Sequence, residues 1–196
     1  MMTWKHASAV MAFCVRTAFF VATLLVLPPV FGPFISAAEA SAQTSLEIRD
    51  VQQRHWESSM RRVIALAEAM PDELFTWAPG EGVMEVGHVY MHIARYNYLY
   101  AIDNLGMPSP DGLDMDTMED VRDKPLVMAA LRESLGWLRE QFAAMDEEKL
   151  SSDTRLYGRT VPGWAVLVQL ETHLSEHLGQ SIAYARMNGI VPPWSR

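Results

Sequence analysis

The stretch PGWAVLVQLETHLSEHLGQSIAYARMNG, residues 162–189, predicts a long helix with a defined start and a defined end. Pro162 suits the first turn of a helix, where no backbone N–H is required. Gly189 suits the position just beyond a helix, and Pro192-Pro193 prevents continuation. Within the stretch, His173 and His177 stand four residues apart and therefore project from one face.

Three earlier segments, about 46–70, 84–105 and 125–145, have the apolar spacing of amphipathic helices. Pro71 ends the first of them and Gly106 the second. We find no strand signal, so four helices of about 20–25 residues predict an all-α fold, a four-helix bundle.

The 3.6-residue period predicts which faces of these helices point inward. The expected inward stripes hold Ile48, Val51, His55, Val63 and Met70; then Val89, His92, Tyr96 and Leu99; and finally Leu170, His173, His177 and Tyr184. Two neutral histidines buried side by side each need partners for both ring nitrogens, and a shared metal ion meets that need. A chance pair on a solvated or core face is the alternative.

His92 would add a third imidazole from the facing helix. Three imidazoles suit Zn²⁺, Ni²⁺ or Fe²⁺ and leave at least one position open, which is the arrangement of a catalytic site. His88 stands four residues before His92 but falls on the flank of its helix, so it is disfavoured as a ligand. His55 is expected to be a hydrogen-bonded core or pocket-wall residue, with a ligand or proton-shuttle role as the alternative.

Other polar residues near these histidines have competing interpretations. Gln180 follows His177 by three residues, so its amide could bond a ligand or a bound water, or only a neighbouring helix. Tyr96 lies one turn after His92 and could line the pocket or pack as ordinary core. Glu176 points about 100° away from His177 on the helix and is expected to be solvated or salt-bridged. No Ser-His-Asp or glycine-rich phosphate motif is credible.

The connection of residues 106–124 is long and acidic. Asp114, Asp116 and Glu119 lack the glycine and the glutamate spacing of a calcium-binding EF-hand loop. We therefore expect a solvated loop and not a calcium site.

The first 42 residues are predicted to be a signal peptide. Arg16 precedes an apolar run, residues 17–27, and Ala40-Ser41-Ala42 is a small-x-small cleavage signal. That run of about 11 residues is shorter than the ~20 of a spanning helix, although an uncleaved membrane anchor is the alternative. Residues 43–196 are then one exported, periplasmic or secreted domain, without stable membrane insertion once the leader is removed.

Composition excludes several kinds of site. Cys14 is the only cysteine and lies in the predicted leader, so the mature chain has no disulfide and no thiolate site. Without Lys5, Arg16 and Glu39, 14 basic and 23 acidic residues leave a net charge of −9. An acidic domain without a basic stripe is a poor binder of nucleic acid.

Four stretches carry a family resemblance: LAEAMPDELFTWAPGEGV (66–83), GHVYMHIARYN (87–97), HLSEHLGQ (173–180) and YARMNGIVPPW (184–194). Together they resemble the DinB/YfiT-like superfamily of metalloenzymes, over about residues 46–194. The resemblance implies a bundle of up-down-down-up topology with a three-histidine site, often for nickel or zinc. It places the ligands at His92, His173 and His177 rather than at His88.

The chain departs from the family beside the last ligand, where Glu176 and Leu178 stand in place of a frequent histidine and arginine. Characterised relatives include transferases and isomerases that use cytosolic low-molecular-weight thiols, and a leader for export argues against that chemistry here.

We therefore expect a metal-dependent hydrolase or transferase that acts on a small molecule. It would hold one divalent ion, Ni, Zn or Fe, whose open position would activate a water as nucleophile or base, or polarise a substrate. The alternative is a non-catalytic bundle that binds metal or a small ligand, and a purely structural bundle ranks third. A homodimer is compatible with the family.

Overall fold

The computed structural model describes residues 37–195, with side chains from residue 44 onward. Its long helices are α1 (Ala37–Ala69), α2 (Val86–Leu99), α3 (Lys124–Ala144) and α5 (Trp164–Met187). The shorter elements are η1 (Asp72–Thr76), η2 (Tyr100–Asn104), η3 (Met118–Asp120), α4 (Glu147–Ser151), β1 (Asp153–Leu156), β2 (Arg159–Pro162) and η4 (Pro193–Ser195). The protein is therefore mostly helical, as the sequence predicts.

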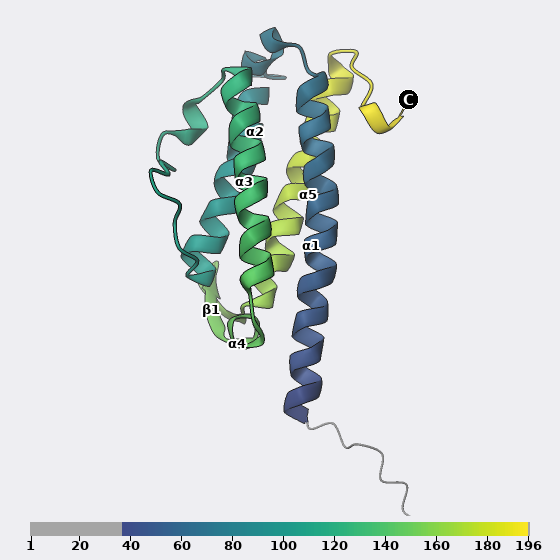
Figure 1. Cartoon of the computed structure of the whole chain (residues 1–196). Coiled ribbons are helices and arrows are strands. Elements are labelled where there is room, and N and C mark those ends of the chain that lie inside the picture. The colour runs from purple at the N-terminus through teal and green to yellow at the C-terminus, as the bar shows by residue number, and fades with distance from the viewer. Residues whose placement is uncertain (1–36, 196) are drawn as a thin grey trace, which may run out of the picture. The chain divides into compact units, whose positions relative to one another are not determined.

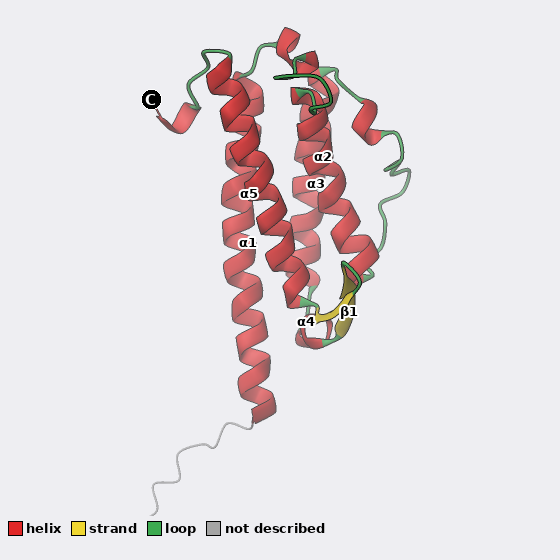
Figure 2. Ribbon diagram, turned by 180° about the vertical axis from the view of Figure 1, so that it is seen from behind, coloured by secondary structure: helices red, strands yellow, loops and turns green. Residues whose placement is uncertain are grey.

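The four long helices pack side by side (Figure 1). Helix α1 contacts α3 and α5, and α2 contacts the same two helices from the other side. The segment between η2 and η3 runs back along the bundle to the start of α3, while α4 and the β1–β2 hairpin cover one end (Figure 2). This arrangement places α2 and α5 in direct contact.

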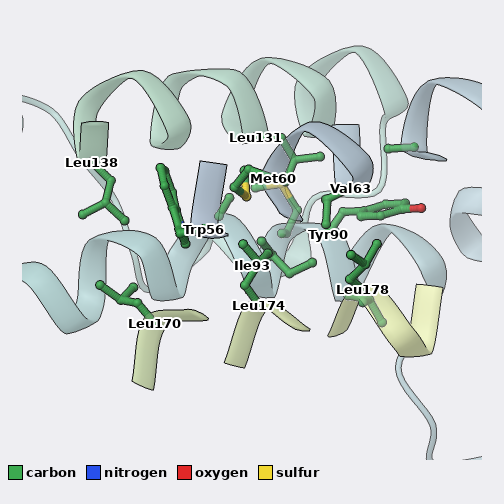
Figure 3. Close-up of a cluster of buried hydrophobic side chains, with 14 of the residues drawn as sticks. Trp56, Met60, Val63, Tyr90, Ile93, Leu131, Leu138, Leu170, Leu174 and Leu178 are labelled. Carbon is green, nitrogen blue, oxygen red and sulfur yellow. The ribbon is translucent and has the colours of Figure 1, made fainter. Parts of the chain in front are cut away.

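The core lies between the long helices, and each of them contributes large apolar side chains to it (Figure 3). Trp56 of α1 is fully buried and packs against Phe142 of α3, with 5.5 Å between ring centroids. Leu170, Leu174 and Leu178 line the buried side of α5. Each such side chain contributes about 1.5–3 kcal/mol by leaving water, so this core fixes how the helices face one another.

A buried polar group also aligns three of the helices. Trp56 Nε1 of α1 donates to Asn97 Oδ1 of α2 at 3.3 Å. Asn97 Nδ2 in turn donates to Ser134 Oγ of α3 at 3.1 Å. Asn97 and Ser134 are both buried, so each needs its partner, and the three helices are held in one register.

The predicted inward stripe of α1 is wrong in its first half. Val51 is 40% exposed and His55 is also exposed, whereas Trp56 and Met60 are fully buried. A step of one residue turns a helix face by about 100°, and Trp56 and Met60 have more apolar surface to bury than His55. Val63 and Met70 are buried as predicted. His55 is thus neither a core nor a pocket-wall residue.

Residues at or near the helix ends determine where the helices begin and end. Helix α1 begins at Ala37, earlier than the predicted Leu46, in an alanine-rich segment of high helix propensity. Asp123 caps α3 by accepting from Leu126 N at 3.1 Å. Gly189, with φ of 74°, ends α5, and Ile190 N donates to Ala185 O at 2.9 Å. This is the αL ending that the sequence predicts.

The expectation that the chain contains no strand is wrong for residues 153–162. Strands β1 and β2 pair antiparallel, with Asp153 opposite Pro162 and Leu156 opposite Arg159. Pro162 therefore ends an edge strand, where proline is tolerated, and α5 begins two residues later at Trp164.

The predicted leader, residues 1–42, lies outside the described residues except for 37–42, which form the start of α1. Within residues 37–195, none of the helices combines the length and the apolar character that crossing a membrane requires.

Candidate metal centre

His92 of α2 and His173 and His177 of α5 lie together where the two helices face each other. One candidate ligand nitrogen from each ring lies within 4.8 Å of the others. The ring centroids are 5.1 Å apart for His92 and His173, 4.8 Å for His92 and His177, and 4.6 Å for His173 and His177. The three imidazoles predicted to meet are thus neighbours, and we call them the histidine trio.

Helix geometry explains why His173 and His177, the two trio residues on α5, lie together. His173 and His177 are one turn apart, so both rings reach the same side of the helix. Leu174 and Leu178, one residue further along in each case, are buried in the core beside them. The core packing of α5 therefore sets the direction in which the His173 and His177 rings point.

His177 is held by Gln180. The His177 Nδ1 and Gln180 Oε1 atoms are 2.8 Å apart, and Gln180 Nε2 donates to the Tyr184 hydroxyl at 2.8 Å. Because Gln180 Oε1 can only accept, Nδ1 of His177 carries a proton, and the neutral form of the ring has its lone pair on Nε2. Gln180 therefore contacts a trio histidine on its own helix, which is one of the two interpretations that the sequence leaves open.

His92 is held by a carboxylate that sequence reasoning missed as a site residue. The His92 Nδ1 and Glu119 Oε1 atoms are 2.8 Å apart. The other oxygen, Oε2, lies 3.1 Å from His88 Nε2, and Arg95 Nη1 lies 3.6 Å from Oε1. Glu119 is in η3, so the expectation of a solvated acidic loop is wrong at this residue, whose side chain is 24% exposed. No spacing signal links it to His92 across 27 residues of sequence.

His173 is the buried member of the trio. Its Nε2 atom is inaccessible to solvent and has no hydrogen-bond partner among the described residues. Burial, with the neighbouring His177 and His92, lowers the pKa of His173 to about 3. The ring is therefore neutral at physiological pH, the form in which imidazole binds metal.

The charge balance at His92 has opposing contributions. Burial lowers the pKa of His92 and His177 lowers it further, while Glu119 opposes both. Burial alone would raise the pKa of Glu119, but its hydrogen bonds to His88 and His92 and the charge of Arg95 outweigh it, so that pKa is lowered. A carboxylate thus faces a neutral imidazole here.

Aromatic side chains surround one side of the trio. The Tyr96 ring stacks on His173 with centroids 4.5 Å apart and lies 4.3 Å from the His92 ring. Tyr96 therefore lies beside two trio rings and also packs against the core, while a hydrogen bond from its hydroxyl to a ligand stays a prediction. The Tyr100 ring lies 5.7 Å from His173, and its hydroxyl contacts the Tyr157 hydroxyl from the hairpin.

The remaining candidate residues are His88, Glu176 and His55. His88 contacts Glu119, and its ring centroid lies 6.4 Å from that of His92, so His88, His92 and Glu119 form a second group that could hold an ion. Glu176 is exposed on α5, as expected, and His55 is exposed on α1.

The chain is similar to proteins of a known family. The family model described as DinB superfamily matches residues 55–181, which include the whole trio. Among solved structures, a DinB-like protein from Bacillus cereus ATCC 10987 is 17% identical with a TM-score of 0.63, and the match covers 72% of this chain and 93% of that one. A DinB-like protein from Bacillus subtilis is 19% identical with a TM-score of 0.43, covering 71% and 93%. No curated protein sequence matches the chain.

Proposed function

This chain belongs to the DinB superfamily, and from that membership we propose that it binds one divalent metal ion through His92, His173 and His177. We further propose that the ion serves a hydrolase or transferase reaction on a small molecule. The up-down-down-up topology expected for the family is part of this proposal, supported by the long connection that returns along the bundle between α2 and α3 (Figure 1).

The unpartnered Nε2 of His173 carries the proposal. A buried polar nitrogen without a partner costs about 1–3 kcal/mol, and a metal ion is a partner that would remove this cost. Gln180 bonds Nδ1 of His177, and Glu119 bonds Nδ1 of His92. The Nε2 atoms of His177 and His92 are thus left for the ion that His173 would bind. The donor set therefore fits a metal ion on all three rings.

Three imidazole ligands favour Ni²⁺, Zn²⁺ or Fe²⁺ over Mg²⁺ or Ca²⁺, which prefer oxygen ligands. When bound, such an ion supplies Lewis acidity and lowers the pKa of a water ligand. On the protein side, Gln180 orients His177 and Tyr96 covers His173, so these two residues shape the site around the ion.

One observation favours a second candidate function, a non-catalytic bundle that binds metal or a small ligand. Glu119 is engaged by His88, His92 and Arg95, and Glu176 is exposed, so neither carboxylate is placed as a general base. A substrate screen of the metal-loaded protein separates the two candidates. Turnover that is unchanged after the metal is removed would exclude the proposed chemistry.

We also propose export to the periplasm or outside the cell, with residues 1–42 as the leader. The support is the apolar run at 17–27 followed by Ala40-Ser41-Ala42. Mass spectrometry of the protein made in a bacterial host tests this, with an N-terminus at Gln43 as the expected result.

Metal binding is tested on protein purified without an affinity tag. We expect close to one equivalent of Ni, Zn or Fe by elemental analysis after incubation with each ion. His92→Ala and His173→Ala should each lower the affinity about 100-fold or more, because each removes a ligand. His55→Ala is the matched control, since His55 is exposed on α1. A stoichiometry near zero with all three ions would refute the metal site.

A further inference from the structure

We propose that Glu119 is a positioning residue of the metal centre, which fixes the tautomer and the orientation of His92 from the acidic connection between α2 and α3. This inference rests on the proposed function, because the orientation of His92 matters through the ion that it would bind.

The contact has the geometry of an orienting hydrogen bond. Glu119 Oε1 lies 2.8 Å from His92 Nδ1, a short distance typical of a bond to a charged acceptor. A carboxylate only accepts, so Nδ1 carries the proton and the lone pair of His92 is on Nε2. The negative charge also makes the imidazole a stronger electron donor to a metal. His177 makes the corresponding Nδ1 hydrogen bond to Gln180, whose side chain is neutral. The hydrogen-bond partners of His92 and His177 therefore differ in charge.

Glu119 is itself held in place by basic residues. Arg95 lies on α2, one turn beyond His92; its Nη1 approaches Glu119 Oε1 at 3.6 Å and its Nε donates to Met115 O at 2.9 Å. Arg122 donates to the Glu119 carbonyl and pairs with Glu85, just before α2. Both ends of the η3 segment are thus tied to α2, and the carboxylate is preset toward His92.

The packing of η3 against α2 is close. A Cβ atom at Gly87 would lie 3.0 Å from the Arg122 Cδ and 2.9 Å from the Phe75 carbonyl oxygen. A side chain at residue 87 would therefore push the Arg122 segment away from α2. This close approach is what allows a loop glutamate to reach a histidine in the middle of a helix.

A second cation site is the competing explanation, because His88, His92 and Glu119 could themselves group around an ion. Arg95 argues against it, since its positive charge already lies beside the same carboxylate and would repel a metal there. His92 Nδ1 is also the atom bonded to Glu119, so an ion would have to displace that proton. The contacts favour positioning.

The test uses the full chain with Glu119→Ala and Glu119→Gln. Glu119→Ala should weaken Zn²⁺ or Co²⁺ binding about 10–100-fold in a chelator competition, and Glu119→Gln less, because its amide oxygen still accepts from Nδ1. The absorption spectrum of the Co²⁺ form should shift in both variants. Asp120→Asn is the matched control: it removes one negative charge from the next residue, which is exposed, and should leave affinity and spectrum unchanged.

Nitrogen NMR of the metal-free protein separates this inference from the proposed function. The wild type should show His92 protonated at Nδ1, and Glu119→Ala should lose that preference, even if no metal binds at all. Should Glu119→Ala fail to fold, Glu119→Met carries the same comparison, because methionine has a similar length and no oxygen that accepts from Nδ1. Wild-type affinity, spectrum and tautomer in a folded variant would overturn the positioning role. Two bound equivalents in the wild type and one in Glu119→Ala would overturn it in favour of a second cation site.

Discussion

His173 shows how a single buried side chain sets the protonation state of the site. Its ring is enclosed by Tyr96, Tyr100 and the two other trio imidazoles, so a positive charge on it would be poorly solvated. The fold therefore keeps the ring neutral in the pH range where free histidine is protonated. The same neutral state that the proposed metal site requires makes the metal-free fold sensitive to acid.

The metal-free protein should lose stability between about pH 6.5 and pH 3. The pKa of His173 is about 3 in the fold and about 6.5 in the unfolded chain, so in this window the unfolded state binds the extra proton. The free energy of unfolding should fall by up to about 1.4 kcal/mol per pH unit from this residue. Urea unfolding of chelator-treated protein at several pH values measures this pH dependence of the free energy of unfolding.

His173→Leu is the comparison that isolates this contribution. The variant still titrates its carboxylates, but it lacks the buried imidazole, so its stability should fall less steeply over the same window. Parallel curves for the two proteins would show that His173 is not the group responsible.

At the scale of elements, the β1–β2 hairpin is joined to α5 through a tightly packed residue. Gly163 N donates to Ser152 O at 3.0 Å, directly before α5 begins. A Cβ atom at Gly163 would lie 2.3 Å from the Lys149 carbonyl oxygen and 3.3 Å from that of Leu150. These are backbone atoms of α4, which cannot rotate away as a side chain can.

Gly163→Ala should destabilise the fold by about 1–3 kcal/mol, because α4 or the start of α5 must move to make room. Gly136→Ala is the matched control. Gly136 lies within α3 with no atom within 4 Å of its virtual Cβ, so alanine should raise stability by up to about 1 kcal/mol through helix propensity. Urea unfolding measures the free energy of unfolding of both variants. An unchanged value for Gly163→Ala would mean that α4 moves to make room at little cost.

The sequence predicts elements well where strong local signals bound them. Pro71, Gly106 and Gly189 stop helices as predicted, because each effect acts within one turn. The hairpin lacks such a signal: its strands have four residues each, and its turn is Tyr157-Gly158. Tyr157 has φ of 48°, a conformation that asparagine or glycine adopts more readily, and its hydroxyl contact with Tyr100 helps to compensate.

At the scale of the whole molecule, the predictable part of the site is the part built on helix faces. His92, His173 and His177 could be placed together because periodicity orients each ring and bundle packing brings α2 against α5. Glu119 could not be placed, because its approach to His92 depends on how Arg95 and Arg122 fasten an irregular loop. Periodicity also predicts the wrong orientation for His55, because burial of the large Trp56 side chain determines which side of α1 faces the core.

The trio joins two distant points of the chain, because His92 and His173 are about 80 residues apart in sequence. An ion held by both rings would bind the folded protein and not the unfolded chain, so it would stabilise the fold by about 2.7 kcal/mol when its concentration is 100 times its Kd. With a single cysteine, Cys14, the chain has no internal disulfide of its own. Adding Zn²⁺ should therefore raise the melting temperature of the wild type and of His55→Ala by several degrees, but not that of His92→Ala; an equal rise in all three would show that the ion does not bridge the helices.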